Sequence, residues 1–161
     1  MIRNLFAIPL LSGFAFMAMG SEFVKETEHQ VLYVVQGKFA DVKENVELAI
    51  TEQGLVIDSV ATVGAMLERT GTDLGATRQI YLDGDVFEFC SAALSREMTE
   101  ADPTNLAFCP YTIHVYTIPE EPGNVYVGYR RPTITGNEQS QVALGKIDRL
   151  LNTIVSESLS W

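Results

Sequence analysis

The chain has 161 residues, with 11 basic and 21 acidic side chains and a formal net charge of −10 at pH 7. This length suits one domain of ordinary size. A surface this acidic repels nucleic acid and anionic membranes, so we expect neither as a partner. Two cysteines are too few for a small domain built mainly from disulfides.

Residues 1–20 have the features of a secretory signal peptide. Residues 1–4 carry one positive charge, residues 5–19 are mostly apolar, and small residues precede a cleavage point after Gly20. The apolar run is about 15 residues long, whereas a membrane span needs about 20. We therefore expect an exported chain, periplasmic in a bacterium and otherwise secreted, with no membrane segment after cleavage. An uncleaved anchor or a buried helix is the alternative.

The first part of the domain follows a polar lead-in at residues 21–30. Residues 31–39 are rich in β-branched and aromatic side chains, which predicts a strand. Asp41 and the Glu that follows three positions later have the pattern of a helix start, and the helix is expected to end at Gly54. A second strand is predicted at residues 55–60.

A short helix is predicted at residues 63–69, ending at Gly71. Residues 79–82 and 86–89 flank Asp83-Gly84-Asp85, and an Asp-Gly pair between such runs predicts a hairpin with a tight turn.

The second half of the domain alternates in the same way. A helix is predicted at residues 92–100, followed by a break at Asp102-Pro103 and a long β-like run at residues 106–118. A last strand is predicted at residues 125–130. The fold class is therefore α+β, with a largely antiparallel sheet of about five to six strands covered by helices.

The C-terminal part, residues 133–161, is predicted to be a polar linker and one amphipathic helix packed on the domain. The helix is expected over residues 139–157, with an apolar stripe that includes Val142, Ile147 and Leu151.

The most distinctive sequence lies between Cys90 and Pro132. It contains Cys90-Ser91-Ala92, Asp102-Pro103, Phe108-Cys109-Pro110-Tyr111 and Val127-Gly128-Tyr129. In this order of elements and cysteines the chain resembles the family catalogued as domain of unknown function 302. The resemblance covers residues 31–131, within an expected domain at 31–132, and leaves the C-terminal helix outside.

The resemblance implies a compact α+β domain that is often dimeric, and it provides no settled activity and no catalytic residue. The family usually has a Pro before the second Cys, where this chain has Phe108 before Cys109 and Pro110 after it. We accordingly expect a homodimer and leave open whether the protein is an enzyme.

Cys90 and Cys109 are the first candidate site residues. They form neither a Cys-x-x-Cys motif nor part of a zinc-type Cys/His quartet. Three interpretations stay open: a structural disulfide formed after export, two reduced apolar side chains, or thiols that react or hold a cofactor. Cys90 precedes a predicted helix, and a helix N-terminus lowers the pKa of a thiol.

His114 and Arg96 complete the candidate set. Strand alternation places His114 with Thr112 and Tyr116 on one face, and Cys109 on the other. His114 is either a half-exposed strand residue or a ligand or acid–base group. Arg96 either binds an anionic substrate or a haem propionate, or pairs with a nearby carboxylate.

Three functions follow from these residues. The favoured one is a module that binds a small ligand, or a haem or metal cofactor, near Cys90, Cys109, His114 and Arg96. The second is a structural or interaction domain stapled by a disulfide between the two cysteines. The third is a thiol-dependent redox or sulfur-compound enzyme. No complete catalytic or phosphate-binding motif is present to select among them.

Overall fold

One antiparallel sheet of six strands is the framework of the protein, and it confirms the predicted α+β class. The computed structural model describes residues 22–160, so the predicted signal peptide lies outside the described residues. The order of the strands across the sheet is β1-β2-β6-β5-β4-β3. Their bounds are β1 (Glu22–Glu26), β2 (Gln30–Gln36), β3 (Val56–Ala61), β4 (Asp83–Cys90), β5 (Tyr111–Thr117) and β6 (Asn124–Arg130).

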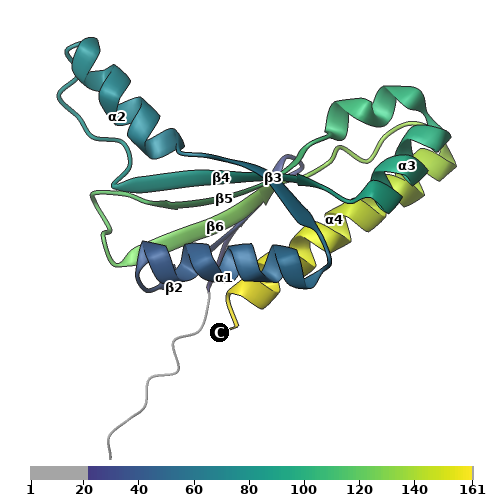
Figure 1. Ribbon diagram of the computed structural model, residues 1–161, viewed down its shortest axis with the longest axis horizontal. Helices are drawn as coiled ribbons and strands as arrows, with labels where there is room; N and C mark the ends of the chain where they lie inside the picture. The colour runs from purple at the N-terminus through teal and green to yellow at the C-terminus, as the bar shows by residue number, and fades with distance from the viewer. Residues whose placement is uncertain (1–21, 161) are drawn as a thin grey trace, which may run out of the picture.

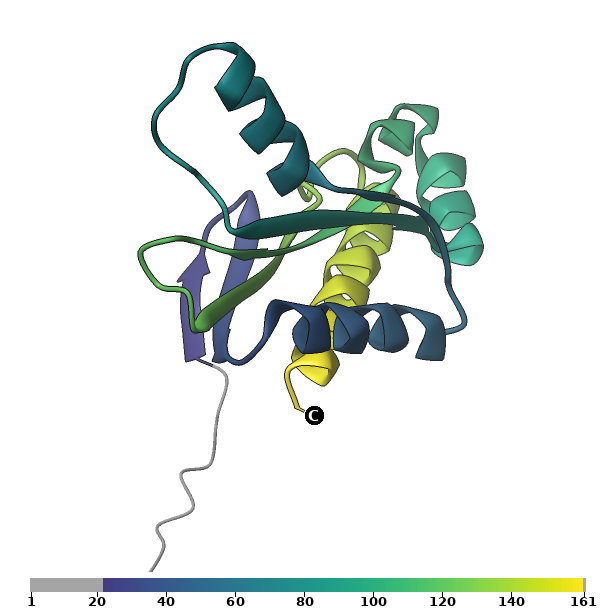
Figure 2. The same cartoon turned by 60° about the vertical axis from the view of Figure 1, so that its left-hand side comes forward.

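The helices are distributed unequally over the two faces of this sheet. Their bounds are α1 (Phe39–Glu52), α2 (Val63–Asp73), α3 (Ala92–Ala101), the short 3-10 helix η1 (Pro103–Phe108) and α4 (Glu138–Ser158). Helices α1 and α4 lie on one side of the sheet, whereas α2 lies on the other side and points away from it (Figures 1 and 2). We call these the covered face and the open face. No helix among residues 22–160 is long and apolar enough to cross a membrane.

The hydrophobic core lies between the covered face and helices α1 and α4. Strand register aligns Val31, Tyr129, Ile113 and Phe87 in one row across β2, β6, β5 and β4. All four are buried, and so are the apolar residues of α4 that face them. The buried residues of α4 include Leu144, Ile147, Leu151, Ile154 and Val155, which confirms most of the predicted stripe. Val142 is 51% exposed and does not belong to it.

Asp83, Gly84 and Asp85 correct one prediction, because they form no hairpin turn. They are the first residues of β4, and Asp83 pairs with Thr117 of β5. Residues 79–82, predicted as the first arm of the hairpin, form no strand. The antiparallel partner of the start of β4 is instead β5, which comes later in the chain.

Tertiary contacts explain why an Asp-Gly pair occurs inside a strand. A Cβ atom on Gly64, in the first turn of α2, would lie 2.7 Å from the backbone nitrogen of Gly84. The two backbones therefore touch, and small residues are needed where α2 leaves the sheet. Asp85 is buried on the covered face, where its carboxylate pairs with Lys43 of α1 at 2.5 Å.

Several element boundaries also differ from the predictions. Residues 22–26 of the expected polar lead-in form the edge strand β1. Helix α1 begins at Phe39 with no side-chain cap, so Asp41 lies inside its first turn. Gly71 lies within α2 and does not end it. The predicted run at residues 106–118 is split, because its beginning belongs to η1 and only Tyr111–Thr117 forms a strand.

Candidate functional site

The open face of the sheet has two rows of side chains in register. The first row consists of Leu32, Gly128, His114 and Val86. The second row consists of Val34, Tyr126, Tyr116 and Gly84. Each row places a glycine directly beside a ring, so the ring can lie close to the backbone of the neighbouring strand.

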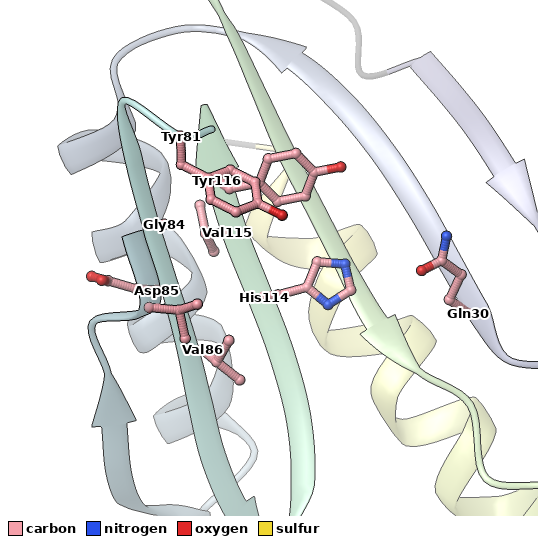
Figure 3. A pocket seen from close by; sticks show the side chains of 9 residues that line it. Gln30, Tyr81, Gly84, Asp85, Val86, His114, Val115 and Tyr116 are labelled. Carbon is pink, nitrogen blue, oxygen red and sulfur yellow. The ribbon is translucent and has the colours of Figure 1, made fainter. Parts of the chain in front are cut away.

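A cleft of about 290 Å³ opens on this face. Residues that line it include Gln30, Val63, Tyr81, Val86, His114 and Tyr116. Figure 3 shows the rings of His114 and Tyr116 projecting side by side from β5, with Tyr81 near Tyr116 and Gln30 on the far side of His114. The segment between α2 and β4 and the start of α2 therefore contribute to the cleft together with the strands.

Tyr116 lies at the centre of an aromatic cluster. Its ring stacks on Tyr126, with centroids 5.0 Å apart and planes 9° from parallel. Its other contacts are with Tyr81, edge to face at 5.3 Å, and with His114, stacked at 6.0 Å. Burial raises the pKa of Tyr116 to about 12, so its hydroxyl keeps its proton at neutral pH. The rings of Tyr81, His114 and Tyr116 line the cleft, and Tyr126 stacks on Tyr116 without lining it.

His114 is the one strongly perturbed base among the residues that line the cleft. Burial lowers its pKa from 6.5 to about 4, so the imidazole is neutral at pH 7. Within residues 22–160 its ring has no hydrogen-bond or ion-pair partner. A Cβ atom on Gly128 would lie 2.7 Å from Nε2 of His114, so the glycine makes room for the ring. One nitrogen can donate and the other can accept a hydrogen bond.

Cys90 and Cys109 form a second cluster at the end of β4. Cys90 is the last residue of β4, and Ser91 caps α3 by accepting a hydrogen bond from the backbone of Leu94. Cys109 directly follows η1, packs against the core and lies 3.3 Å from the hydroxyl of Ser95. That hydroxyl also lies 2.9 Å from the hydroxyl of Tyr111. Both cysteines are free thiols and are partly buried.

The pKa of Cys90 differs from the sequence-based expectation. A helix N-terminus was expected to lower it, but burial and the adjacent thiol of Cys109 raise it to about 11. A thiolate here would lose its hydration and face a second sulfur, which favours the protonated form. Cys90 is therefore protonated at neutral pH.

The structure brings together only two of the four candidate site residues. Cys90 and Cys109 interact with each other, whereas His114 projects from the opposite face of the sheet to the one that Cys109 packs against. Arg96 is exposed on α3, and its guanidinium lies 2.7 Å from Glu100, one turn along the helix. No group of three His, Cys, Asp or Glu side chains within residues 22–160 has the spacing to hold a metal ion.

The family of the chain is shown by the match of a family model. Residues 32–157 match the model described as "Domain of unknown function DUF302". The chain belongs to this family. The match includes α4, which corrects the expectation that the C-terminal helix lies beyond the DUF302 domain.

A solved structure supports the same fold. The crystal structure of an uncharacterised conserved DUF302 protein from Bacillus stearothermophilus superposes with a TM-score of 0.67 at 14% sequence identity. The similarity covers 80% of this chain and 96% of that one. No curated protein matches the chain. At this identity the likeness shows the shared DUF302 fold and provides no assignment of function.

Most of the cleft residues that the sequence analysis missed belong to no local sequence motif. Alternation in β5 did place Tyr116 beside His114, and the burial pattern of β5 confirms that alternation. Tyr81 reaches the cleft from a segment without regular structure, so only the folded chain reveals it. Gly84 and Gly128 carried a signal, since a glycine inside a strand often marks a close approach.

Proposed function

We propose that this protein is an exported module that binds a small, planar, uncharged aromatic molecule in the open-face cleft. The observation that carries the proposal is the neutral imidazole of His114, which has no hydrogen-bond partner among residues 22–160 and lies beside the stacked rings of Tyr116 and Tyr126. A hydrogen-bonding group at the side of flat rings is the arrangement that orients a planar heterocycle.

The charge of the cleft favours an uncharged ligand. Its one acidic lining residue, Asp85, pairs with Lys43 of α1 through the covered face. His114 is neutral at pH 7, and the amide of Gln30 both donates and accepts hydrogen bonds. An anionic ligand would therefore find no free cation among these residues.

The size of the cleft favours a ligand of one or two rings. Its volume of about 290 Å³ lies at the lower end of the range for small-molecule sites, roughly 300–1,000 Å³. A haem group would extend beyond it. The cysteine pair and Arg96 lie elsewhere and do not contribute to this cleft.

Binding of heteroaromatic probes tests the proposal. We expect indole and benzimidazole to shift the backbone amide signals of β5 and α2 in two-dimensional NMR, and cyclohexanol to shift them far less. His114→Leu should weaken benzimidazole binding at least tenfold, because the ring loses its hydrogen-bond partner. Arg96→Gln is the matched control and should bind normally. Equal shifts with cyclohexanol, or unchanged binding by His114→Leu, would refute the proposal.

We also propose that the module is a homodimer that uses α2. Within α2, only Gly64 is buried, while Met66 is 46% exposed and Leu74, which follows the helix, is 80% exposed. The helix points away from its own sheet in both views (Figures 1 and 2). A helix with exposed apolar residues gains stability when a partner covers them. Its adjacent Glu68 and Arg69 carry opposite charges, which suits a self-complementary two-fold interface.

Light scattering coupled to size-exclusion chromatography tests the dimer. The native protein should elute with the mass of two chains, and a Met66→Asp, Leu74→Asp double variant should elute as a monomer. The control is Leu106→Asp, which alters a residue that is 65% exposed on η1 and should leave the dimer intact. A native protein that is monomeric at high concentration contradicts the proposal.

Export is the third part of the proposal, and it rests on the signal-like pattern of residues 1–20. The intact mass of protein expressed with its own N-terminus should correspond to cleavage after Gly20. A chain that keeps Met1–Gly20 in the cytoplasm would show that export is wrong and would leave the ligand proposal standing.

A further inference from the structure

The two cysteines meet because of the register between β4 and β5. Phe89 pairs with Tyr111, so the next position of β4, Cys90, lies at the level of Pro110 and next to Cys109. The two thiols are close enough that Cys109 adds to the effect of burial in raising the pKa of Cys90. Residues 91–108, which contain α3 and η1, form the loop between them. A fixed strand pairing therefore holds two thiols together that are far apart in sequence.

The surroundings of the thiols favour chemistry between two sulfurs. Ser95 contacts Cys109 and is itself held by Tyr111, so the Cys109 side chain has a defined position. Both thiols are partly exposed, so a small reagent can reach them. Within residues 22–160 no third metal-ligating side chain joins the pair, which distinguishes the cluster from a structural metal site.

We infer that Cys90 and Cys109 form a dithiol site that closes to an intramolecular disulfide by exchange with a low-molecular-weight disulfide. One cysteine loses its proton, and its thiolate attacks a sulfur of the reagent RSSR, giving a mixed disulfide and the first RSH. The second cysteine then attacks the protein sulfur of the mixed disulfide and the second RSH leaves. In total, two electrons and two protons pass from the cysteines to RSSR.

The environment of the site predicts how this reaction responds to pH. Burial keeps Cys90 protonated at neutral pH, since its pKa is raised to about 11. The attacking species is the thiolate, so exchange at Cys90 should accelerate about tenfold per pH unit below that value. Attack by the Cys90 sulfur is therefore slow at pH 7 and becomes faster in mildly alkaline solution.

Closure should also stabilise the fold around α3 and η1. Linking the two ends of this loop restricts the unfolded chain, and the native strand pairing already holds the two cysteines near each other. We expect the melting temperature of the oxidised protein to exceed that of the reduced protein by roughly 5–10 °C.

The experiment uses the full mature chain, first reduced with dithiothreitol and then treated with oxidised glutathione at pH 8.5. Intact mass should fall by two hydrogens, with no glutathione retained and no cysteine left for iodoacetamide. Cys90→Ser and Cys109→Ser should each keep one glutathione on the remaining cysteine. Circular dichroism confirms that both variants are folded before they are compared.

Two outcomes would overturn the inference. In the first, the native protein retains one or two glutathione adducts, which means that the second attack does not occur. In the second, both cysteines stay open to iodoacetamide after oxidation at pH 8.5. His114→Leu is the matched control and should close normally, because the cleft is lined by residues at the start of β4, whereas Cys90 is the last residue of that strand. Its behaviour separates this inference from the ligand proposal, since the two can fail independently.

Discussion

The two faces of the sheet are made by the same strands, yet they carry different chemistry. On the covered face, Phe87, Ile113 and Val115 are fully buried under helices α1 and α4. On the open face, their sequence neighbours Val86, His114 and Tyr116 remain partly exposed and line a cleft. Alternation along each strand thus separates residues that hold the fold from residues that are free to meet a ligand.

The two faces contribute unequally to the stability of the fold. Burial of an apolar side chain on the covered face stabilises the protein by about 1.5–3 kcal/mol. A stacked pair such as Tyr116 and Tyr126 on an open face contributes far less, roughly 0.5–1.5 kcal/mol beyond its buried area. Folding alone does not require a neutral histidine and three tyrosines there, so their presence favours a binding role.

The largest effect should come from truncating the covered face. Phe87→Ala removes a fully buried ring and should lower the free energy of unfolding by about 3–5 kcal/mol. Its neighbour Val86→Ala, on the open face, should cost less than about 1 kcal/mol. Urea denaturation measures both. A large loss for Val86→Ala in the native protein but not in the monomeric Met66→Asp, Leu74→Asp variant would show that a second copy covers the open face.

The next largest effect should come from Gly128 of β6, which contacts the backbone of β2 and the imidazole of His114. A Cβ atom on Gly128 would meet the backbone oxygen of Val31 and lie 2.7 Å from Nε2 of His114. Gly128→Ala should therefore cost about 1–3 kcal/mol and displace the imidazole. The control is Gly145→Ala in α4, where the nearest atom is 3.6 Å away and helix propensity should improve stability by up to about 1 kcal/mol.

Much of the covered face could be predicted from the sequence, because its signals are local. The alternation in β5 and the helical spacing in α4 are properties of a few consecutive residues, and both predictions are confirmed. The break at Asp102-Pro103 is confirmed for the same reason, since Asp102 caps η1 through the backbone of Thr104.

The failed predictions involve residues whose role depends on distant parts of the chain. Gly84 indicated a turn, but it is small because Gly64 of α2 approaches it. The sequence predicts Asp85 in the same turn, but its carboxylate pairs with Lys43 of α1. The pKa of Cys90 was expected to be low from its place before a helix, and it is high because burial and Cys109 dominate. No local pattern contains these partners.

Lowering the pH should have an intermediate effect on the free energy of unfolding, through the protonation of His114 on the open face. In the unfolded chain His114 binds a proton below its ordinary pKa of 6.5, whereas in the folded protein burial holds its pKa near 4. The unfolded state therefore binds more protons between these values, and stability falls as the pH drops through this window. His114 should account for no more than about 3 kcal/mol of that loss.

The measurement is the urea-unfolding free energy at pH 7, 6, 5 and 4 for the native protein and for His114→Leu. Carboxylates titrate in both proteins, so the difference between the two curves isolates the histidine. The variant should lose less stability than the native protein between pH 6.5 and 4. Parallel curves would show that the imidazole is freely protonated in the folded state.

The smallest effect on stability should come from Tyr116, although this residue should matter as much as His114 for binding. Tyr116→Phe keeps the ring that stacks on Tyr126 and should change the unfolding free energy by less than about 0.5 kcal/mol. Tyr116→Leu loses the stacking and should cost roughly 0.5–1.5 kcal/mol. Benzimidazole binding should survive in the first variant and weaken at least tenfold in the second. If both variants bind benzimidazole equally well, the aromatic cluster contributes to the fold and not to the binding site. The open face would then have no binding role at Tyr116 that distinguishes it from the covered face.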